Sequence, residues 1–458
     1  MSASTLWPTP ANLRWLESVL HERIASGLRL QQEQGYLRVT HVAAEGSIRI
    51  PSAPAFSGRQ LDGCAPWAVS DEGRSAAAGP NRLPAPGLNH IEGPLITRNG
   101  TGYSINYDIP GLTYWMLSRC EEVKAQRFDV FGRFPAGDSH AFRHGYLHRP
   151  IVDEWLDVLR QVMQRLWPQL PFAQRTFEVK VSHDVDVPSR YGFASLTRLG
   201  RHIAADLLKR RDLRGALQAA RIRMNTRGAL LGNDPMNTFD WLMDQSEERG
   251  LKSAFYFICG RTDRKRDADY DLEHPAIRKL LRRIHERGHE IGLHPSFNTY
   301  LDAGKLALEA RHLRSICAEE GIRQTEWGGR MHYLRWRHPV TLNAWNEAGM
   351  TYDSTLGYAE APGFRCGTCI EYPAFDPVAD RPLTLRIRPL IAMETSIMSP
   401  QYLGLGNGPE ALAKLRALKN ACRDAGGTFT LLWHNSSLQT PEDKALYCAV
   451  LDDARPNS

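Results

Sequence analysis

Three short segments, far apart in the chain, place carboxyl or imidazole groups where a strand is predicted to end. They span residues 182–186, 289–298 and 431–434. The carboxyl ends of neighbouring parallel strands meet at one edge of a sheet, so such groups can come together there. Carboxylates and imidazoles bind divalent cations and transfer protons. The pattern is typical of a metal-assisted hydrolase site.

The first segment follows an alternation of apolar and polar residues over 177–181, which predicts a strand. Asp184 and Asp186 are two residues apart and therefore point to one face of that strand. Two carboxylates so close repel each other unless a cation lies between them. We expect one to bind a divalent metal and the other to act as a base. The alternative is a pair of strand-end aspartates that cap the next turn.

The second segment predicts a short strand that ends at His294. It follows a predicted helix whose apolar residues recur at helical spacing: Ile277, Leu280, Leu281 and Ile284. His294 and Asn298 are four residues apart, so one helical turn after the strand would present both side chains to a common point. A lone histidine at a strand end is more often a hydrogen-bonded core residue, and this is the expectation for His289.

With these motifs the chain resembles the polysaccharide deacetylase family, the NodB-homology or carbohydrate esterase family 4 enzymes. Residues 182–186 resemble the family's Thr-Phe-Asp-Asp-like segment, and 294–298 its His-x-x-x-His pair. Residues 330–333 resemble its Arg-x-Pro-Tyr segment, and 432–434 its Leu-x-His. The four motifs occur in the family's order and the likeness spans roughly residues 175–440, which makes it more specific than any single motif.

The resemblance implies a role for each matching residue. The implied catalytic residues are Asp184, Arg330, Tyr333 and His434; the implied metal ligands are Asp186, His294 and Asn298; substrate contacts are expected at His332, Arg335, Asp353 and Trp433. Asp184 would act as base, paired with Arg330, and a backbone N–H near Tyr333 would stabilise the oxyanion. His434 would protonate the leaving amine, with Asp353 as its expected orienting partner. The alternative for His434 is a hydrogen-bonded core residue beside Trp433.

Three positions depart from the family pattern. The acidic motif is Asp-x-Asp, and His332 replaces the proline of the fourth-strand motif. Asn298 stands where the family has a second histidine. Because an amide oxygen is a weaker ligand than an imidazole, the sequence predicts loose metal binding, or completion of the site by Ser296 or a water. Zinc is the expected cofactor, with cobalt, nickel or manganese as alternatives.

Strands and helices alternate from Phe177 onward, the pattern of a parallel α/β sheet or barrel. The resemblance implies an irregular (β/α) barrel with about seven strands, whereas the sequence alone does not separate a barrel from an open sheet. We expect this domain over 173–458, preceded by a small α/β domain over 1–172. The latter begins with a helix over 9–28 whose apolar stripe is Leu13, Leu16, Val19, Leu20 and Ile24.

A basic helical insertion is predicted over about 188–236, where a βα loop is usually only a few residues long. Its apolar stripe includes Leu199, Ile203 and Leu207, and arginines greatly outnumber acidic residues. Two interpretations remain open. The insertion is either a solvated charged face, or a surface for an anionic membrane or a diphosphate-linked substrate.

The composition is that of an ordinary globular enzyme, with 458 residues, 42% hydrophobic and 24% charged. A net charge of +6 without zinc-finger spacing or an aromatic and basic repeat gives no support for a nucleic-acid partner. The first residues lack a secretory pattern, so a cytoplasmic protein with eight reduced cysteines is expected. Cys366 and Cys369 are expected to be two buried thiols, and their role and the oligomeric state stay open.

These patterns together predict a metal-dependent deacetylase. The expected substrate is an N-acetylated sugar in a glycan, a lipid-linked saccharide or a nucleotide-sugar. One alternative is an amidohydrolase that acts on a non-sugar C–N bond. Another is a sugar-binding protein whose metal site has decayed, for which Asn298 is the main argument.

Overall fold

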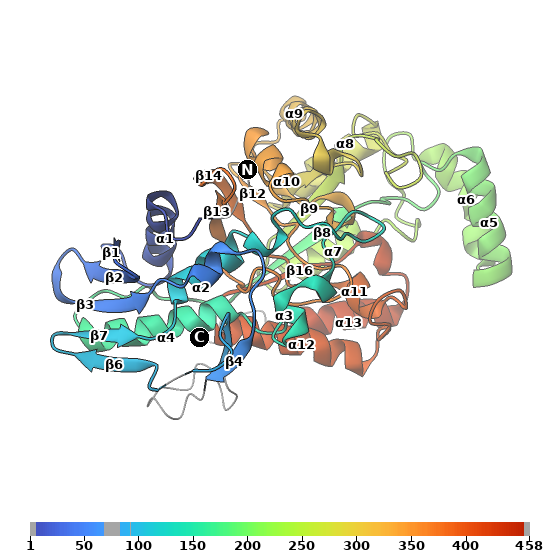
Figure 1. Ribbon diagram of the computed structural model, residues 1–458. Coiled ribbons are helices and arrows are strands. Elements are labelled where there is room, and N and C mark those ends of the chain that lie inside the picture. Colours follow the sequence, from blue (N-terminus) through green and yellow to red (C-terminus); the bar gives the residue numbers. More distant parts are fainter. Residues whose placement is uncertain (1–5, 68–82, 92, 453–458) are drawn as a thin grey trace.

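The computed structural model describes residues 6–67, 83–91 and 93–452 (Figure 1). The strands of its central sheet are β8 (Glu178–Val185), β9 (Ser253–Ile258), β10 (Glu290–His294), β11 (Gly328–Gly329), β12 (Tyr352–Asp353), β13 (Tyr372–Asp376), β14 (Arg381–Ile387), β15 (Ala392–Met393) and β16 (Thr428–Leu432). Their order is β13-β14-β12-β11-β10-β9-β8-β16-β15. Neighbouring strands are parallel except β13 and β14, which are antiparallel.

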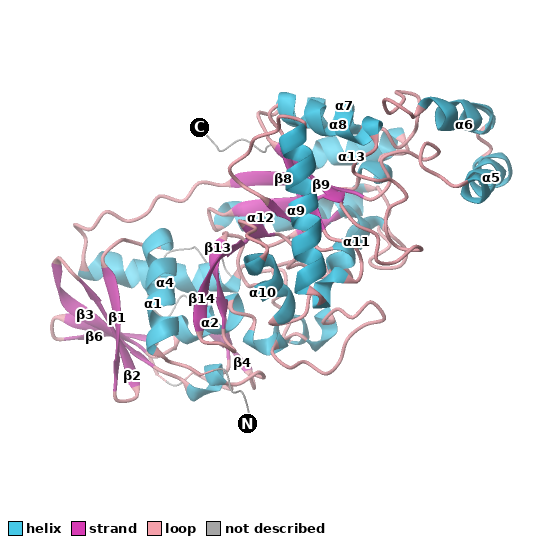
Figure 2. Cartoon of the chain, turned by 90° about the horizontal axis from the view of Figure 1, so that it is seen from above, coloured by secondary structure: helices cyan, strands magenta, loops and turns pink. Residues whose placement is uncertain are grey.

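Helices connect most of these strands, as the alternating pattern predicts. They are α7 (Phe239–Glu247), α8 (Pro275–Glu286), α9 (Ala303–Glu319), α10 (Val340–Glu347), α11 (Glu394–Met398), α12 (Pro409–Asp424) and α13 (Pro441–Leu451). Figure 2 shows the helices stacked against the strands of the sheet. The fold is therefore mixed α/β with a mainly parallel sheet, which confirms the predicted class.

The expected irregular barrel with about seven strands is not confirmed. Within the described residues the two outer strands, β13 and β15, do not pair with each other. The nine-stranded sheet is therefore an open sheet. Local alternation of strands and helices predicts a parallel sheet. Closure depends instead on how the first and last strands meet, which the local sequence pattern does not specify.

The strand register brings the chemically active segments to one edge of the sheet. Asp184 lies near the end of β8, beside β9, whose Ile258 pairs with His294 at the end of β10. On the other side of β8, strand β16 ends at Leu432, opposite Ser182. Residues that follow these strand ends are therefore close in space although they are far apart in sequence.

Burial patterns explain why these segments form the core. Every residue of β9 is buried, as expected for a parallel strand that is covered on both faces. In α8 the buried residues include the predicted stripe, Ile277, Leu280, Leu281 and Ile284. This stripe packs the helix on the sheet and confirms the periodicity found in the sequence.

The N-terminal part forms a second, smaller sheet. Its elements are α1 (Pro10–Arg23), β1 (Leu28–Glu33), β2 (Tyr36–His41), β3 (Ala44–Pro51), β4 (Cys64–Trp67), β5 (Leu83–Pro86), β6 (Ile96–Asn99), β7 (Gly102–Ile105), α2 (Ile109–Leu117), α3 (His140–Arg143) and α4 (Ile151–Leu166). Strands in the order β1-β2-β3-β7-β6 make a five-stranded sheet, and β4 pairs with β5. The stripe predicted for the first helix is buried in full: Leu13, Leu16, Val19, Leu20 and Ile24.

Both parts contribute to one continuous hydrophobic core. Trp15 of α1 donates its indole N–H to the carbonyl of Pro373 on β13, at 2.9 Å. Arg23 forms a buried salt bridge of 2.8 Å with Asp153 of α4 and also donates to Thr368. The N-terminal part is thus packed firmly on the larger one, and the boundary at residues 172 and 173 stays a prediction.

A helical hairpin lies between β8 and α7. It consists of α5 (Leu196–Ala205), the short π-helical segment η6 (Asp206–Arg210) and α6 (Leu213–Asn225). Figures 1 and 2 show α5 and α6 at the end of the molecule opposite the five-stranded sheet, projecting from the body. None of the helices in the described ranges has the length and apolarity needed to cross a bilayer. All eight cysteines are free thiols, and Cys366 and Cys369 are buried.

Candidate metal centre

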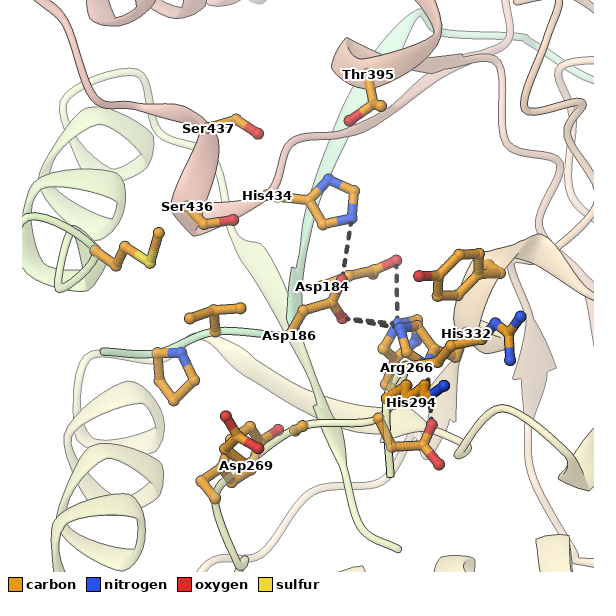
Figure 3. A pocket seen from close by; sticks show the side chains of 18 of the residues that line it. Asp184, Asp186, Arg266, Asp269, His294, His332, Thr395, His434, Ser436 and Ser437 are labelled. Carbon is orange, nitrogen blue, oxygen red and sulfur yellow. Dashed lines mark hydrogen bonds and ion pairs between the residues drawn. The ribbon is translucent and has the colours of Figure 1, made fainter. Parts of the chain in front are cut away.

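A cavity of about 730 Å³ opens at the carboxyl ends of the central strands (Figure 3). Asp184 lies near the end of β8, and Asp186 is the first residue after this strand. His294 ends β10, His332 follows β11, and His434 follows β16. All five side chains line the cavity, so the sheet collects three imidazoles and two carboxylates in one place.

Asp186, His294 and His332 form the group best placed to bind a metal. Oδ1 of Asp186 lies 3.2 Å from Nε2 of His294 and 3.7 Å from Nε2 of His332. One ligand atom from each residue lies within 4.8 Å of the other two. Among the described residues this is the one such group of histidine, cysteine and acidic side chains. Two imidazoles and a carboxylate are a common ligand set of catalytic zinc sites.

Hydrogen bonds hold both histidine rings in the tautomer that a metal requires. Nδ1 of His294 lies 2.6 Å from the carbonyl oxygen of Arg330, which can only accept, so this nitrogen carries the proton. Nδ1 of His332 lies 3.2 Å from Oδ1 of Asp267. With Nδ1 as the donor in each ring, the neutral form of each imidazole has its Nε2 lone pair available for a cation beside Asp186.

The centre has the electrostatics of a cation site. Oδ1 of Asp186 is a buried oxygen without a hydrogen-bond partner among the described residues. Burial opposes ionisation of this carboxyl, but the imidazoles of His332 and His294 lower its pKa below the ordinary value. Burial likewise opposes the charged form of His294, yet Asp184 and Asp186 raise its pKa. Positive charge is favoured here, and a divalent cation between the three residues fits the donor set.

Asp184 is held by a buried arginine. Nη1 of Arg330 donates to Oδ1 of Asp184 at 2.8 Å, and both side chains are almost completely buried. Nη2 of Arg330 donates to the hydroxyl of Ser182 at 2.9 Å, and Nε donates to the carbonyl of Ser354 at 3.0 Å. Oδ2 of Asp184 remains 3.7 Å from Nε2 of His294. The guanidinium therefore fixes one carboxylate oxygen and leaves the other at the centre.

His434 lies on the opposite side of the two aspartates and has a carboxylate partner of its own (Figure 3). Nδ1 of His434 lies 2.7 Å from Oε1 of the buried Glu394, and Nε2 lies 3.7 Å from Oδ2 of Asp186. Burial lowers the pKa of this imidazole, but Glu394 and the aspartates outweigh that effect and raise it to about 10. Ser437 and Thr395 also donate to Glu394 and keep it in place.

The structure places Asn298 outside the centre and brings His332 next to Asp186 and His294, in the group that could hold a metal. Asn298 is exposed; its amide donates to the carbonyl of Thr262 at 3.2 Å, and its oxygen accepts from Arg335 at 3.2 Å. The expectation assumed a helical turn directly after His294. Instead the chain after Pro295 turns away from the sheet, because Ser296 is bound through its N–H to Glu309. A histidine replaces the family's proline at position 332, and this departure was the sequence signal that His332 could belong to the metal-binding group.

The partner expected for His434 is also different. Asp353 is buried, accepts from Trp336 and the N–H of Thr355, and does not contact His434. Its burial raises its pKa to about 6. Glu394 takes the place expected for Asp353. Glu394 directly follows β15, so its position at a strand end is the sequence signal that could have identified it.

The other expected contacts are divided between the cavity and the core. Tyr333 lines the cavity with 37% of its surface exposed and has a positive φ of 61°. Trp433 is fully buried against Tyr447 and is not part of the cavity wall. Arg335 packs over Phe297 at 3.8 Å and donates to the carbonyl of Phe131, likewise away from the wall.

Comparison with known proteins gives limited information. The model of a family of unknown function, DUF7033, matches residues 46–168, in the N-terminal part. No curated protein matches the chain. Several solved structures are similar to this chain. A putative polysaccharide deacetylase from Mycobacterium smegmatis is 19% identical, with a TM-score of 0.39 over 61% of this chain and 84% of its own. Puue allantoinase is 12% identical, with a TM-score of 0.37 over 61% and 83%. At these scores neither likeness carries an argument about function.

Proposed function

We propose that the protein is a metal-dependent hydrolase that removes the acetyl group from an N-acetylated sugar. One observation carries the proposal. A ligand triad, an arginine-bound aspartate and a glutamate-bound histidine converge on a single cavity. Hydrolysis of an amide needs a polarised carbonyl, a base for water and an acid for the leaving amine. The three groups have the chemistry for these three tasks.

Asp186, His294 and His332 would hold the metal. A bound divalent cation would acidify a water molecule and polarise the amide carbonyl. Zinc fits two imidazoles and one carboxylate best, and cobalt, nickel and manganese are the alternatives. Three protein ligands leave coordination positions open, as a catalytic rather than a structural site requires.

Asp184 is assigned as the general base. Its contact with Arg330 holds the carboxylate in place and fixes the direction of its lone pairs. The free oxygen, Oδ2, faces His294 and the ligand triad. In that position it would accept the proton of a water molecule that attacks the amide carbon.

His434 is assigned as the general acid. The bond to Glu394 places the exchangeable proton on Nε2, which faces the cavity and Asp186. Donation from Nε2 to the amine nitrogen would allow the C–N bond to break without expulsion of an amide anion. A backbone N–H near Tyr333, which lines the same cavity, is the proposed donor to the oxyanion.

The choice of an N-acetylated sugar rests on the resemblance to polysaccharide deacetylases in four ordered motifs. The glycan, lipid-linked saccharide and nucleotide-sugar classes remain candidate substrates, and hydrolysis of a non-sugar C–N bond is the alternative. The binding-protein alternative rested on Asn298 as a poor ligand. If His332 is the third ligand, as proposed, Asn298 is not needed as a ligand and no longer supports that alternative.

The test is release of acetate from a panel of N-acetylated sugars. The protein is first stripped with a chelator and then reloaded with one equivalent of zinc. We expect acetate and free amine in equal amounts from at least one sugar, no release after chelation, and recovery with zinc. Release that continues unchanged after chelation would overturn the metal requirement. Turnover confined to cyclic amides in a parallel panel would favour the non-sugar alternative.

A further inference from the structure

The hairpin between β8 and α7 exposes an unusual amount of apolar surface. Six large apolar side chains on it point into solvent: Leu196 81% exposed, Leu207 44%, Leu208 81%, Leu213 66%, Leu217 82% and Met224 62%. Large apolar side chains exposed singly are normal, but six on one short projecting unit form a patch. Such a patch marks a contact surface for another molecule.

The apolar residues of α6 form one stripe. Leu213, Leu217 and Met224 are four and seven residues apart, so they lie along the same side of the helix. The opposite side carries Ala219 and Ile222, which are buried. The stripe therefore faces away from the rest of the hairpin and is not the face that holds it together.

The same hairpin is strongly basic. Residues 195–227 contain nine lysines and arginines and two aspartates, a net charge of +7, whereas the full chain has 57 basic and 51 acidic residues and a net charge of +6. Within the described residues no salt bridge neutralises the exposed side chains of Arg201, Lys209, Arg211, Arg214, Arg221 and Arg227. On α6, Arg214 and Arg221 lie beside the apolar stripe.

The hairpin is an ordered unit. It has a small core of its own, made of Tyr191, Ala194, Leu199, Ala219 and Ile222. Asp206 is fully buried and accepts from Arg190 at 2.6 Å, from Tyr191 at 2.8 Å and from Arg210 at 2.9 Å. Its two acidic residues are thus used internally, Asp206 in this network and Asp212 as the N-cap of α6. Among the described residues of the hairpin, the exposed charged groups are therefore basic.

We propose that this hairpin docks on the surface of an anionic lipid bilayer. An apolar stripe flanked by arginines matches an interface in which the leucines enter the acyl boundary and the guanidinium groups contact lipid phosphates. A nucleic acid would use the arginines but not the stripe. A second copy of the chain would cover the stripe, but outside the hairpin the chain has a net charge of only −1 to set against the +7 of the hairpin.

The hairpin also adjoins the candidate metal centre. Arg198, Arg201 and His202 of α5 line the same cavity as Asp186 and His294. A molecule docked through the hairpin would therefore hold its cavity at the bilayer surface. The docking itself is independent of the proposed reaction and is measurable without substrate or metal.

Vesicle co-sedimentation tests the docking. The full chain is mixed with vesicles of phosphatidylcholine alone, or with added phosphatidylglycerol. We expect binding that needs the anionic lipid and that is lost at high salt, because the charges are exposed. R214Q/R221Q should weaken binding roughly thirtyfold, at about fivefold for each arginine near the surface. L213S/L217S/M224S should also abolish sedimentation with vesicles.

Matched controls carry the same chemical changes elsewhere. R14Q/R416Q removes two exposed arginines from α1 and α12, and L308S changes an apolar side chain that is 59% exposed on α9. These variants should bind vesicles like the wild type, and all variants should keep its melting temperature. Equal binding to both vesicle types, or unchanged binding of the hairpin variants, would overturn the proposal. So would a dimer in sedimentation velocity that only the L213S/L217S/M224S variant converts to monomer.

Discussion

Asp184→Asn is expected to lower kcat by about 10³ to 10⁴, at the upper end of the effect of one acid-base group, while the protein keeps one metal ion per chain. The amide cannot take a proton from water, which removes the base. Its oxygen can still accept from Arg330, so the buried arginine keeps a partner. Kinetics on the zinc-loaded enzyme and metal content by elemental analysis measure the two effects separately.

Ser182→Ala is the matched control for this variant. Ser182 contacts the same guanidinium at 2.9 Å but does not reach the ligand triad. Its loss should cost kcat much less than the loss of the carboxylate, with no change in metal content. If Asp184→Asn releases the metal, then Asp184 is a ligand and not the base. A kcat close to that of the wild type would remove it from the reaction altogether.

His332→Ala is expected to remove metal binding, whereas Asn298→Ala is expected to leave it unchanged. The first variant deletes one of the three proposed ligands, and the second deletes an exposed amide that bonds Thr262 and Arg335. Asp267→Asn should give an intermediate result, about 10- to 100-fold weaker binding, because this carboxylate orients the His332 ring from behind. Calorimetric titration of the metal-free proteins with zinc provides the three affinities.

The order of these affinities decides between two ligand sets. Normal zinc affinity in His332→Ala together with loss in Asn298→Ala would restore the amide as the third ligand and contradict the structure. A loss in both variants would show that the loop carrying Asn298, which contacts Arg335, supports the site indirectly. Circular dichroism of each variant excludes unfolding as the cause.

The strand ends were the part of the site that could be predicted from the sequence. The alternation of apolar and polar residues over 177–181 predicted the strand that carries Asp184. The apolar stripe of α8 predicted the helix that precedes the strand ending at His294. Both patterns are local and can therefore be recognised in the sequence. Parallel register then brings the carboxyl ends of the two strands together. Strand-end reasoning also singled out His434, but it did not identify Glu394, which directly follows β15.

The residues that were misplaced lie on loops. Asn298 was expected to follow a helical turn, but Ser296 is tied to Glu309 and the chain leaves the site. His332 enters the site from a loop where Tyr333 has a positive φ, a conformation that helical or strand periodicity cannot specify. Sheet closure was uncertain for the same reason, since it depends on contacts between distant segments.

The central claim is that Asp186, His294 and His332 bind one catalytic metal. Anomalous diffraction from crystals of the zinc-loaded protein, recorded on both sides of the zinc edge, tests it most directly. A single strong peak should lie about 2.0 to 2.2 Å from a carboxylate oxygen of Asp186 and from Nε2 of His294 and His332. A peak next to Asn298 and away from His332 would contradict the account. So would a zinc peak elsewhere in the protein with none in this cavity.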